Sequence, residues 1–272
     1  MRMSNPTRML SSIDGALCML AMMATPHSQA DMLLSYDFDE ASGPALNSGT
    51  VGTSANASLL GSVTRSSDTP SGVGSSLDLV PEAGNDSGAN AGLVTQLDNK
   101  NTFTVTFWIK MTGTPAANQR ILGNRSTGPN KGLDVFINNP DTGSIGNSNF
   151  RIFYSHSAVG SQTLDIDASD WTFVAFRMDG SIASPNDNLT GYIGDTNSMS
   201  VNFTDDVYTG TPPVPPGTQD SPAEFWMGGA DDLGGNRTPP ALLDDIRVYD
   251  EALTQAQIDA IRVGTIPEPG TV

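Results

Sequence analysis

Short runs of alternating apolar and polar residues recur along the chain between about residues 31 and 264. Successive side chains of a β-strand point to opposite faces, so this alternation predicts half-buried strands. Clusters rich in Gly, Pro, Asn, Asp and Ser, which are typical of turns, separate the runs. The clearest predicted strands cover residues 34–38, 103–109, 171–177 and 242–249, and shorter ones cover 76–79, 135–137 and 225–227.

The last of these runs leads directly into a segment with helical periodicity. Alternation divides the predicted strand into one face with Leu242, Asp244, Ile246 and Val248 and a second face with Leu243, Asp245, Arg247 and Tyr249. Downstream, Thr254 is a suitable N-cap, and Gln257 stands at the reciprocal position of a capping box. Ile258 and Ile261 fall on one side of a short helix that we expect to end before Gly264.

About a dozen short strands without a long helix predict a two-sheet sandwich or a barrel. The 272 residues suffice for one large all-β domain or two small ones, and the absence of a repeat of fixed period favours one. The loop 205–224 contains five prolines and therefore cannot be a central strand. Loops of this length carry recognition or decorate an edge.

The chain is strongly acidic, with 13 Lys and Arg against 30 Asp and Glu and a formal net charge of -17. This charge argues against binding to nucleic acid or to anionic lipid, because both would be repelled. It is compatible with an extracellular protein that binds divalent cations, and equally with acidity that only maintains solubility. The single cysteine, Cys18, excludes a disulfide within the chain.

Residues 1–30 have the features of a secretory signal peptide. Arg2 and Arg8 give a positive start, an apolar run covers 15–24, and Ser28-Gln29-Ala30 offers the small residues of a cleavage site. The apolar run is too short for a transmembrane helix, which needs about 20 residues. We therefore expect export with cleavage after Ala30, and a secreted or cell-surface location.

The order of the predicted strands resembles the laminin-G-like, concanavalin A-like jelly rolls of secreted bacterial proteins. The final strand with its Asp-Asp pair and the helix behind it carry the resemblance, which continues through most of the chain. The matching segments are 35–43, 76–79, 103–110, 170–176, 225–229 and 242–258. The resemblance implies an all-β fold, a two-sheet antiparallel jelly-roll sandwich with a short C-terminal helix, over residues 31–264.

The last eight residues, 265–272, contain Pro267-Glu268-Pro269. This tripeptide resembles the beginning of a PEP-CTERM sorting signal, which in that family continues with an apolar membrane-spanning segment and a cluster of arginines. Neither follows in this sequence. Either the sequence is a fragment of a longer chain, or the match is accidental in a proline-rich tail. We expect contact with a membrane only through such a sorting tail.

The sequence offers little of the machinery that hydrolases use. His27 lies in the predicted leader, so a Ser-His-Asp triad could use only His156, and no Gly-x-Ser-x-Gly elbow accompanies it. A zinc site with several histidines is excluded. Glycoside hydrolysis is the enzyme alternative, and it needs two carboxylates across the sugar ring. The Glu-x-Asp-x-x-Glu motif of concanavalin-like glycosidases is missing, so we predict a non-catalytic protein.

A structural calcium ion is the cofactor that the resemblance implies. In the resembling folds an aspartate at the start of the last strand reaches an ion, and backbone oxygens of the first strand complete its shell. Asp244 is the matching residue, with Asp39 as its expected neighbour and Asp37 and Asp245 as second choices. An inward carboxylate beside Ile246 would be costly unless it is paired or bound to metal. The alternative is pairing of Asp244 or Asp245 with an arginine, such as Arg247, or with a backbone N–H.

Aromatic side chains are candidates for a sugar-binding platform, because their faces stack on sugar rings. Trp108 points opposite to Phe107, and Trp226 follows the proline-rich loop. Tyr208 is a candidate by its position in that loop. Packing in the core is the alternative role for each of them, and we expect it for Trp171.

Together these features predict an exported, non-catalytic binding or adhesion module. By resemblance, the expected partner is an extracellular polysaccharide or glycoconjugate. A structural surface or matrix protein without a small ligand would explain the same features.

Overall fold

The structure is a computed structural model that describes residues 30–82, 87–98, 100, 102–116, 118–124, 133–140, 147–153, 161–181, 189–204, 224–229 and 237–264. Most of the predicted leader, the tail 265–272, His156 and loop residues 205–223 with Tyr208 lie outside this part. In the described ranges, no helix is long and apolar enough to cross a membrane.

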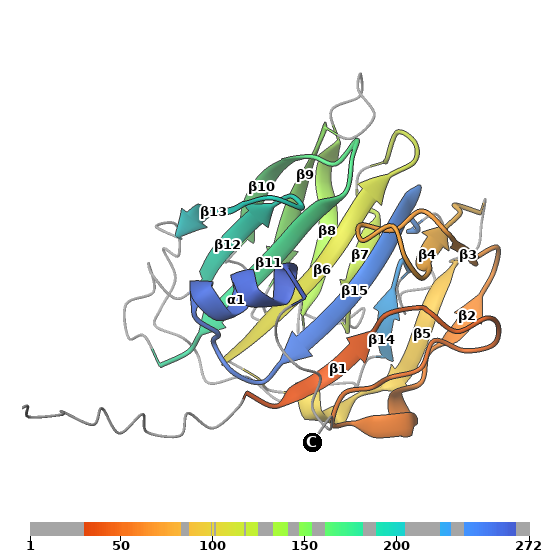
Figure 1. Cartoon of the computed structure of the whole chain (residues 1–272), viewed down its shortest axis with the longest axis horizontal. Coiled ribbons are helices and arrows are strands. Elements are labelled where there is room, and N and C mark those ends of the chain that lie inside the picture. The colour runs from red at the N-terminus through yellow and green to blue at the C-terminus, as the bar shows by residue number, and fades with distance from the viewer. Residues whose placement is uncertain are drawn as a thin grey trace, which may run out of the picture.

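The first of two sheets contains eight strands (Figure 1). Seven follow one another in the order β13 (Met199–Thr204), β12 (Leu189–Gly194), β11 (Thr172–Asp179), β6 (Thr102–Met111), β15 (Ala241–Tyr249), β4 (Ser76–Leu79) and β3 (Thr64–Ser66), and β1 (Met32–Tyr36) pairs with β15. All pairings are antiparallel. The opening and closing strands of the chain therefore lie side by side in this sheet.

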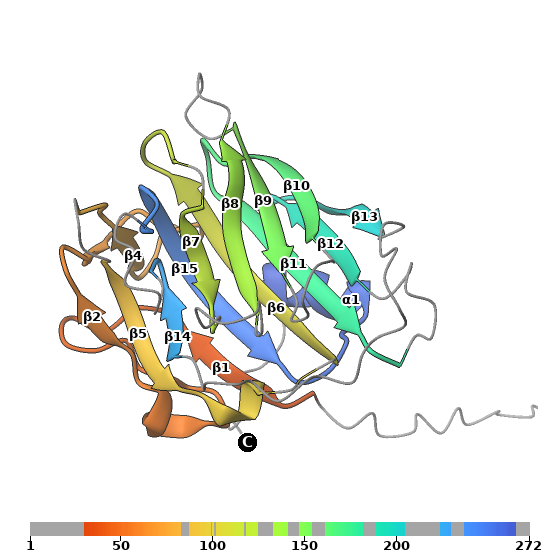
Figure 2. The ribbon, with the colours of Figure 1, turned by 180° about the vertical axis from the view of Figure 1, so that it is seen from behind.

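The second sheet contains seven strands and faces the viewer in Figure 2. Its order is β10 (Ser161–Asp167), β9 (Asn147–Phe153), β8 (Asp134–Pro140), β7 (Arg120–Gly123), β14 (Glu224–Met227), β5 (Gly88–Leu93) and β2 (Ser58–Leu60), again antiparallel throughout. Two short 3-10 helices, η1 (Gly52–Ala55) and η2 (Thr95–Leu97), lie in connecting segments. The prediction of a two-sheet antiparallel jelly-roll sandwich is confirmed.

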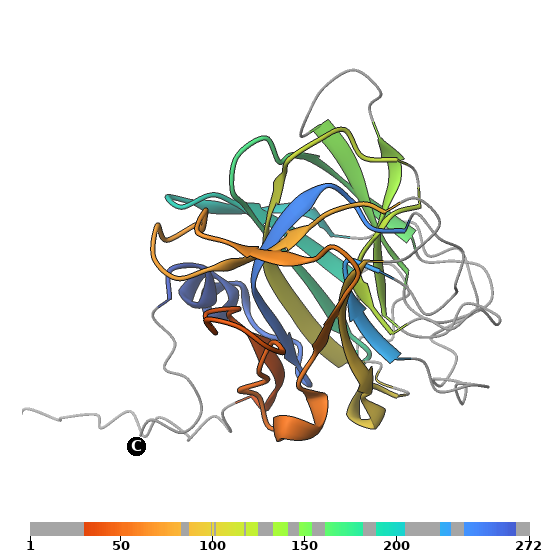
Figure 3. The ribbon, with the colours of Figure 1, turned by 90° about the vertical axis from the view of Figure 1, so that its right-hand side faces the viewer.

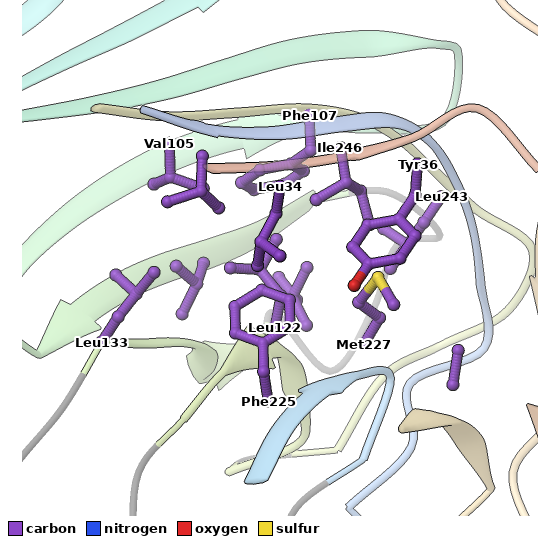
Figure 4. Close-up of a cluster of buried hydrophobic side chains, with 14 of the residues drawn as sticks. Leu34, Tyr36, Val105, Phe107, Leu122, Leu133, Phe225, Met227, Leu243 and Ile246 are labelled. Carbon is purple, nitrogen blue, oxygen red and sulfur yellow. The ribbon is translucent and has the colours of Figure 1, made fainter. Parts of the chain in front are cut away.

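The main core fills the space between the two sheets (Figure 4). Leu34, Tyr36 and Phe107 extend from the eight-stranded sheet toward Phe225 and Met227 of the seven-stranded sheet. All five are almost completely buried. Burial of side chains of this size stabilises a fold by about 1.5–3 kcal/mol each, so this layer joins the two sheets into one unit.

A second apolar cluster lies on the outer face of the eight-stranded sheet, beneath α1 (Gln255–Arg262) (Figures 1 and 3). Ile258 and Ile261 of the helix pack there with Trp108, Phe173 and Tyr249. The predicted capping box is present: the Thr254 side chain accepts a hydrogen bond from the Gln257 N–H, and the Gln257 side chain accepts one from the Thr254 N–H. The central strands of this sheet are therefore buried on both faces, which explains their nearly continuous apolar character.

Candidate functional site

On the side away from β6, strand β15 changes its pairing partner part-way along its length (Figure 1). Leu243 pairs with Leu77 of β4, whereas Ile246 pairs with Tyr36 of β1. Asp244 and Asp245 fall between these two registers. The topology thus leaves a break in the sheet edge directly beside two consecutive carboxylates.

A β-bulge lies at the same two residues. Asp244 is opposite Trp108 and Arg247 is opposite Thr106, so three steps along β15 match two along β6. Asp245 is the extra residue, with a left-handed φ of 50°. Such an insertion reverses the phase of alternation.

The bulge corrects one sequence-based prediction. Asp244 does not share the inward face with Ile246. It lies on the outer face with its cross-strand partner Trp108, and Leu243 rather than Leu242 enters the main core. The physical reason is that strict alternation cannot cross an extra residue.

The other wall of the site comes from the turn after β1. Phe38 has a φ of 56°, which is rare for a bulky residue, and its ring is buried in the main core. The neighbouring Asp37 and Asp39 are exposed. Asp39 Oδ1 accepts a hydrogen bond from the Ser75 N–H at 2.7 Å, so the loop before β4 fixes this carboxylate.

These segments surround one pocket of about 420 Å³. Its lining contains all four aspartates predicted as metal ligands, together with Trp108. The structure therefore brings together five of the seven residues singled out by the sequence. The remaining lining comes from the loop before β4 (Pro70, Ser71, Val73), from Thr196, and from the end of α1 (Arg262, Val263, Gly264).

Asp244 is the most buried acid of the pocket, with 7% of its surface exposed. Its Oδ1 accepts a hydrogen bond from the Asp245 N–H at 2.8 Å, and no ion pair to it is formed by the described residues. Burial raises the pKa of this carboxyl to about 8, and the charges of Asp245, Asp39 and Asp37 act in the same direction. A carboxyl group with this pKa is mostly protonated at neutral pH.

The other carboxylates are in different environments. Asp245 Oδ1 forms an ion pair with the Arg247 guanidinium at 2.8 Å, as the alternative to metal binding predicts. The backbone N–H partner predicted for Asp244 is also present. At the mouth, the pKa of Asp37 is raised by partial loss of hydration and then by the charges of Asp39 and Glu40.

Arg262 is the cation among the described lining residues, and its hydrogen bonds lead elsewhere. Its Nε donates to Asp259 Oδ1 at 2.8 Å, and a terminal nitrogen donates to the Asp195 carbonyl at 2.6 Å. Four carboxylates therefore share the pocket wall with one guanidinium that is already engaged.

The donor chemistry of the pocket suits calcium, since hard oxygens are its preferred ligands. The arrangement of the acidic side chains, however, does not form a calcium site. Across the described ranges, no group of three or more His, Cys, Asp or Glu side chains is placed to hold a metal ion. An ion here would need backbone oxygens or water for most of its shell.

The aromatic candidates lie apart from one another. Trp108 is only 4% exposed at the pocket and makes an edge-to-face contact with Phe173, with 5.4 Å between the centroids. Trp226 of β14 alternates with the core residues Phe225 and Met227, and so faces outward from the seven-stranded sheet. Tyr208 lies outside the described residues. Trp171 is buried in the outer apolar cluster, as the packing role predicts, and its Nε1 donates to Asp68 Oδ1 at 2.8 Å.

Sequence reasoning missed the loop before β4 and the end of α1. The loop is rich in Ser, Gly and Pro, which predicts a turn but not its position. Only the pairing of both β1 and β4 with β15 places it opposite Asp39. Arg262 in the last helical turn was the one available signal for the helix end.

A family model described as the concanavalin A-like lectin/glucanases superfamily matches residues 83–259. The match covers more than half of the chain. The chain belongs to this superfamily. No curated protein matches this concanavalin A-like chain at a significant level.

Solved structures with the same fold include proteins in complex with sugars. Domain 4 of AbnA, an extracellular GH43 arabinanase from Geobacillus stearothermophilus, in complex with arabinotriose, aligns with a TM-score of 0.56 and 17% identity over 86% of this chain and 99% of that chain. A Trypanosoma rangeli sialidase in complex with sialic acid aligns with a TM-score of 0.54 and 15% identity. The alignment covers 87% of this chain and 33% of the sialidase chain.

A botulinum neurotoxin DC binding domain, in complex with SialylT, aligns with a TM-score of 0.52 and 13% identity over 87% of this chain and 51% of that chain. This concanavalin A-like chain thus spans nearly the whole arabinanase domain, but only about a third of the sialidase and half of the toxin fragment. At these identities the likeness shows the fold alone.

Proposed function

We propose that this concanavalin A-like domain is a non-catalytic carbohydrate-binding module, and that the sugar binds in the pocket at the β15 bulge. The observation that carries the proposal is a hollow of about 420 Å³ whose floor holds Asp244 and Trp108 and whose mouth holds Asp37 and Asp39. Ionised carboxylates only accept hydrogen bonds, and sugar hydroxyl groups donate them. The sugar complexes of the arabinanase domain and the toxin fragment support this partner class.

A glycan array probed with the full chain tests the proposal. We expect binding to a defined group of glycans that weakens at least tenfold in Asp39→Asn, whose side chain is exposed and keeps the acceptor for Ser75. Trp226→Ala is the matched control on the other sheet, and it should bind normally. Loss of binding in Trp226→Ala alone would move the site to the seven-stranded sheet. A silent array would favour the structural surface protein.

One observation favours a second candidate, glycoside hydrolysis. A carboxyl group with a raised pKa beside ionised carboxylates is the acid and base pair that glycosidases use, and Asp244 beside Asp39 has this character. The test is release of reducing ends from plant and algal polysaccharides. Turnover that disappears in Asp244→Asn would establish the enzyme, whereas binding without turnover supports the module.

Calcium is proposed only as a structural ion, because the side chains alone do not form its site. Melting the full chain with calcium and with EGTA tests this. A higher melting temperature in calcium that is lost in Asp244→Ala supports the ion. No shift in the wild type, or an equal shift in Asp244→Ala, would remove it.

We also propose that the domain acts outside the cell after cleavage following Ala30, with residues 31–264 as the folded unit and residues 265–272 as the beginning of a sorting tail. N-terminal sequencing of the protein recovered from the medium tests the cleavage. An intact Met1 on that protein would contradict the proposed leader.

A further inference from the structure

The pocket has an excess of negative charge that the described residues do not neutralise. Asp245 is paired with Arg247, and Arg262 is engaged by Asp259 and the Asp195 carbonyl. Asp37, Asp39 and Asp244 have no cationic partner in the described ranges. Asp244 is more than nine-tenths buried, and its one hydrogen bond comes from the adjacent backbone N–H to Oδ1. Its second oxygen accepts no hydrogen bond from those residues.

We propose that the pocket selects glycans that carry protonated primary amines, that is, amino sugars whose nitrogen is free rather than acetylated. The inference rests on the proposed carbohydrate-binding function and names its ligand class. Beside a neutral sugar the ionised form of the buried Asp244 carboxyl would lack a counter-charge and remain costly, so the group would keep its proton. An ammonium group supplies the missing charge and three N–H donors.

When no calcium is bound, the spacing of the acids suits an organic cation. A metal ion draws its ligands into one tight shell, and the described side chains form no such group. Here the carboxylates are distributed from the floor, at Asp244, to the mouth, at Asp37 and Asp39. The volume of about 420 Å³ lies within the range of pockets that hold small organic ligands. A sugar ring carrying its charge on an exocyclic nitrogen can reach the floor while its ring stays higher in the pocket.

The rim supplies the apolar surface that a sugar ring needs. Val73 of the loop before β4 is 79% exposed, and Val263 after α1 is 48% exposed. Both line the pocket together with its four aspartates. Two exposed aliphatic side chains at the mouth can cover the C–H face of a ring whose ammonium group points inward. A single small cation would make no use of them.

Isothermal titration of the full chain in buffer with EDTA tests the inference. The probes are a hexamer of glucosamine and a hexamer of N-acetylglucosamine, at a pH of about 6 where the free amines are protonated. We expect the deacetylated oligomer to bind at least tenfold more tightly than the acetylated one. Asp244→Asn and the exposed Asp39→Asn should each remove most of this preference. Asp31 is exposed, lies just before β1 and is not part of the pocket. Asp31→Asn therefore removes the same charge outside the pocket and should retain the preference for the deacetylated oligomer.

Several results would overturn the inference, and they separate it from the proposed function. Equal affinity for both oligomers, lost in Asp39→Asn, would mean that the pocket binds sugar without recognising the amine, so the proposed function would stand. Equal weakening by Asp31→Asn and Asp39→Asn would assign the preference to overall charge. Tighter, Asp39-dependent binding of a lysine peptide would make the partner a protein. No binding of any glycan would refute both.

Discussion

At the scale of single residues, the close approach of two loops depends on Gly74. Its φ is 85°, and a Cβ placed there would lie 2.1 Å from Asp39 Oδ1. The loop before β4 therefore reaches the Asp39 carboxylate only because residue 74 has no side chain. This contact also gives Asp39 its hydrogen bond from Ser75, so a local steric requirement sets the orientation of a pocket acid.

We predict that Gly74→Ala lowers stability by about 1–3 kcal/mol, since it adds displacement of the Asp39 carboxylate and loss of its Ser75 hydrogen bond to the cost of a left-handed alanine. The same change should weaken glycan binding, because Asp39 must move. Gly72→Ala is the matched control, with a φ of 71° and no atom within 4 Å of the added Cβ. It should lose about 1–2 kcal/mol and bind normally. Urea unfolding and glycan titration of both variants would measure this, and equal effects in the two would contradict the argument.

The raised pKa of Asp244 makes stability depend on pH. The folded pKa of about 8 lies above the ordinary value of 3.8, so between these limits the folded state binds more protons than the unfolded state. Stability from this group is therefore greatest at low pH and decreases as the pH rises toward 8. The charged groups that face it in the pocket are Asp37, Asp39, Asp245 and Arg262.

We predict that, in EDTA and without ligand, the free energy of unfolding falls between pH 5 and pH 8 by up to about 1.4 kcal/mol per pH unit. In Asp244→Asn this slope should be much smaller, and at pH 8.5 the variant should melt above the wild type. Denaturant unfolding across the pH series measures both. A wild type that becomes more stable between pH 5 and pH 8 would show that Asp244 does not control this range.

At the scale of elements, the helix α1 closes the outer face of the eight-stranded sheet. It has eight residues, and helices of this length are marginal in isolation. Ile258 and Ile261 pack against Trp108 and Tyr249, and so hold the helix in place. The end of the helix forms part of the pocket through Arg262, so helix packing and pocket shape are coupled.

We predict that Ile258→Ala costs about 2–5 kcal/mol, the usual range for a buried large-to-small change. Gln255→Ala, at an exposed position of the same helix, should change stability by less than about 0.5 kcal/mol. Chemical denaturation of the two variants provides the comparison. A small effect of Ile258→Ala would mean that the helix contributes little to the fold.

The strands and the helix were predictable because their signals are local. Thr254, Gln257, Ile258 and Ile261 specify the helix by caps and spacing alone. The bulge was not predictable, because β15 is apolar on both faces and its pattern fits either phase. The resemblance to the family correctly predicted that Asp244 lies near Asp39, although alternation assigned Asp244 to the inner face of the sheet. Both carboxylates line one pocket, at the break between β4 and β1.

At the scale of the whole molecule, residues before the matched family segment are integral to the fold. The family match begins at residue 83, yet β1, β2, β3 and β4 all precede it. Strands β1 and β4 are the two partners of β15 on the side away from β6. They also supply the buried side chains Leu34, Tyr36, Leu77 and Leu79 to the main core. Without them the pocket would lose Asp37 and Asp39.

We predict that a fragment of residues 83–259 does not fold cooperatively, whereas residues 31–264 do. Four large side chains buried at about 1.5–3 kcal/mol each amount to about 6–12 kcal/mol, which is comparable to the entire stability of a typical domain. Thermal melting of both fragments, followed by circular dichroism, decides the matter. A sharp transition in the 83–259 fragment near that of the longer one would place the folding unit inside the matched segment. A sharp transition in the 31–264 fragment alone would show that the segment before residue 83, including β1, completes both the core and the acidic pocket.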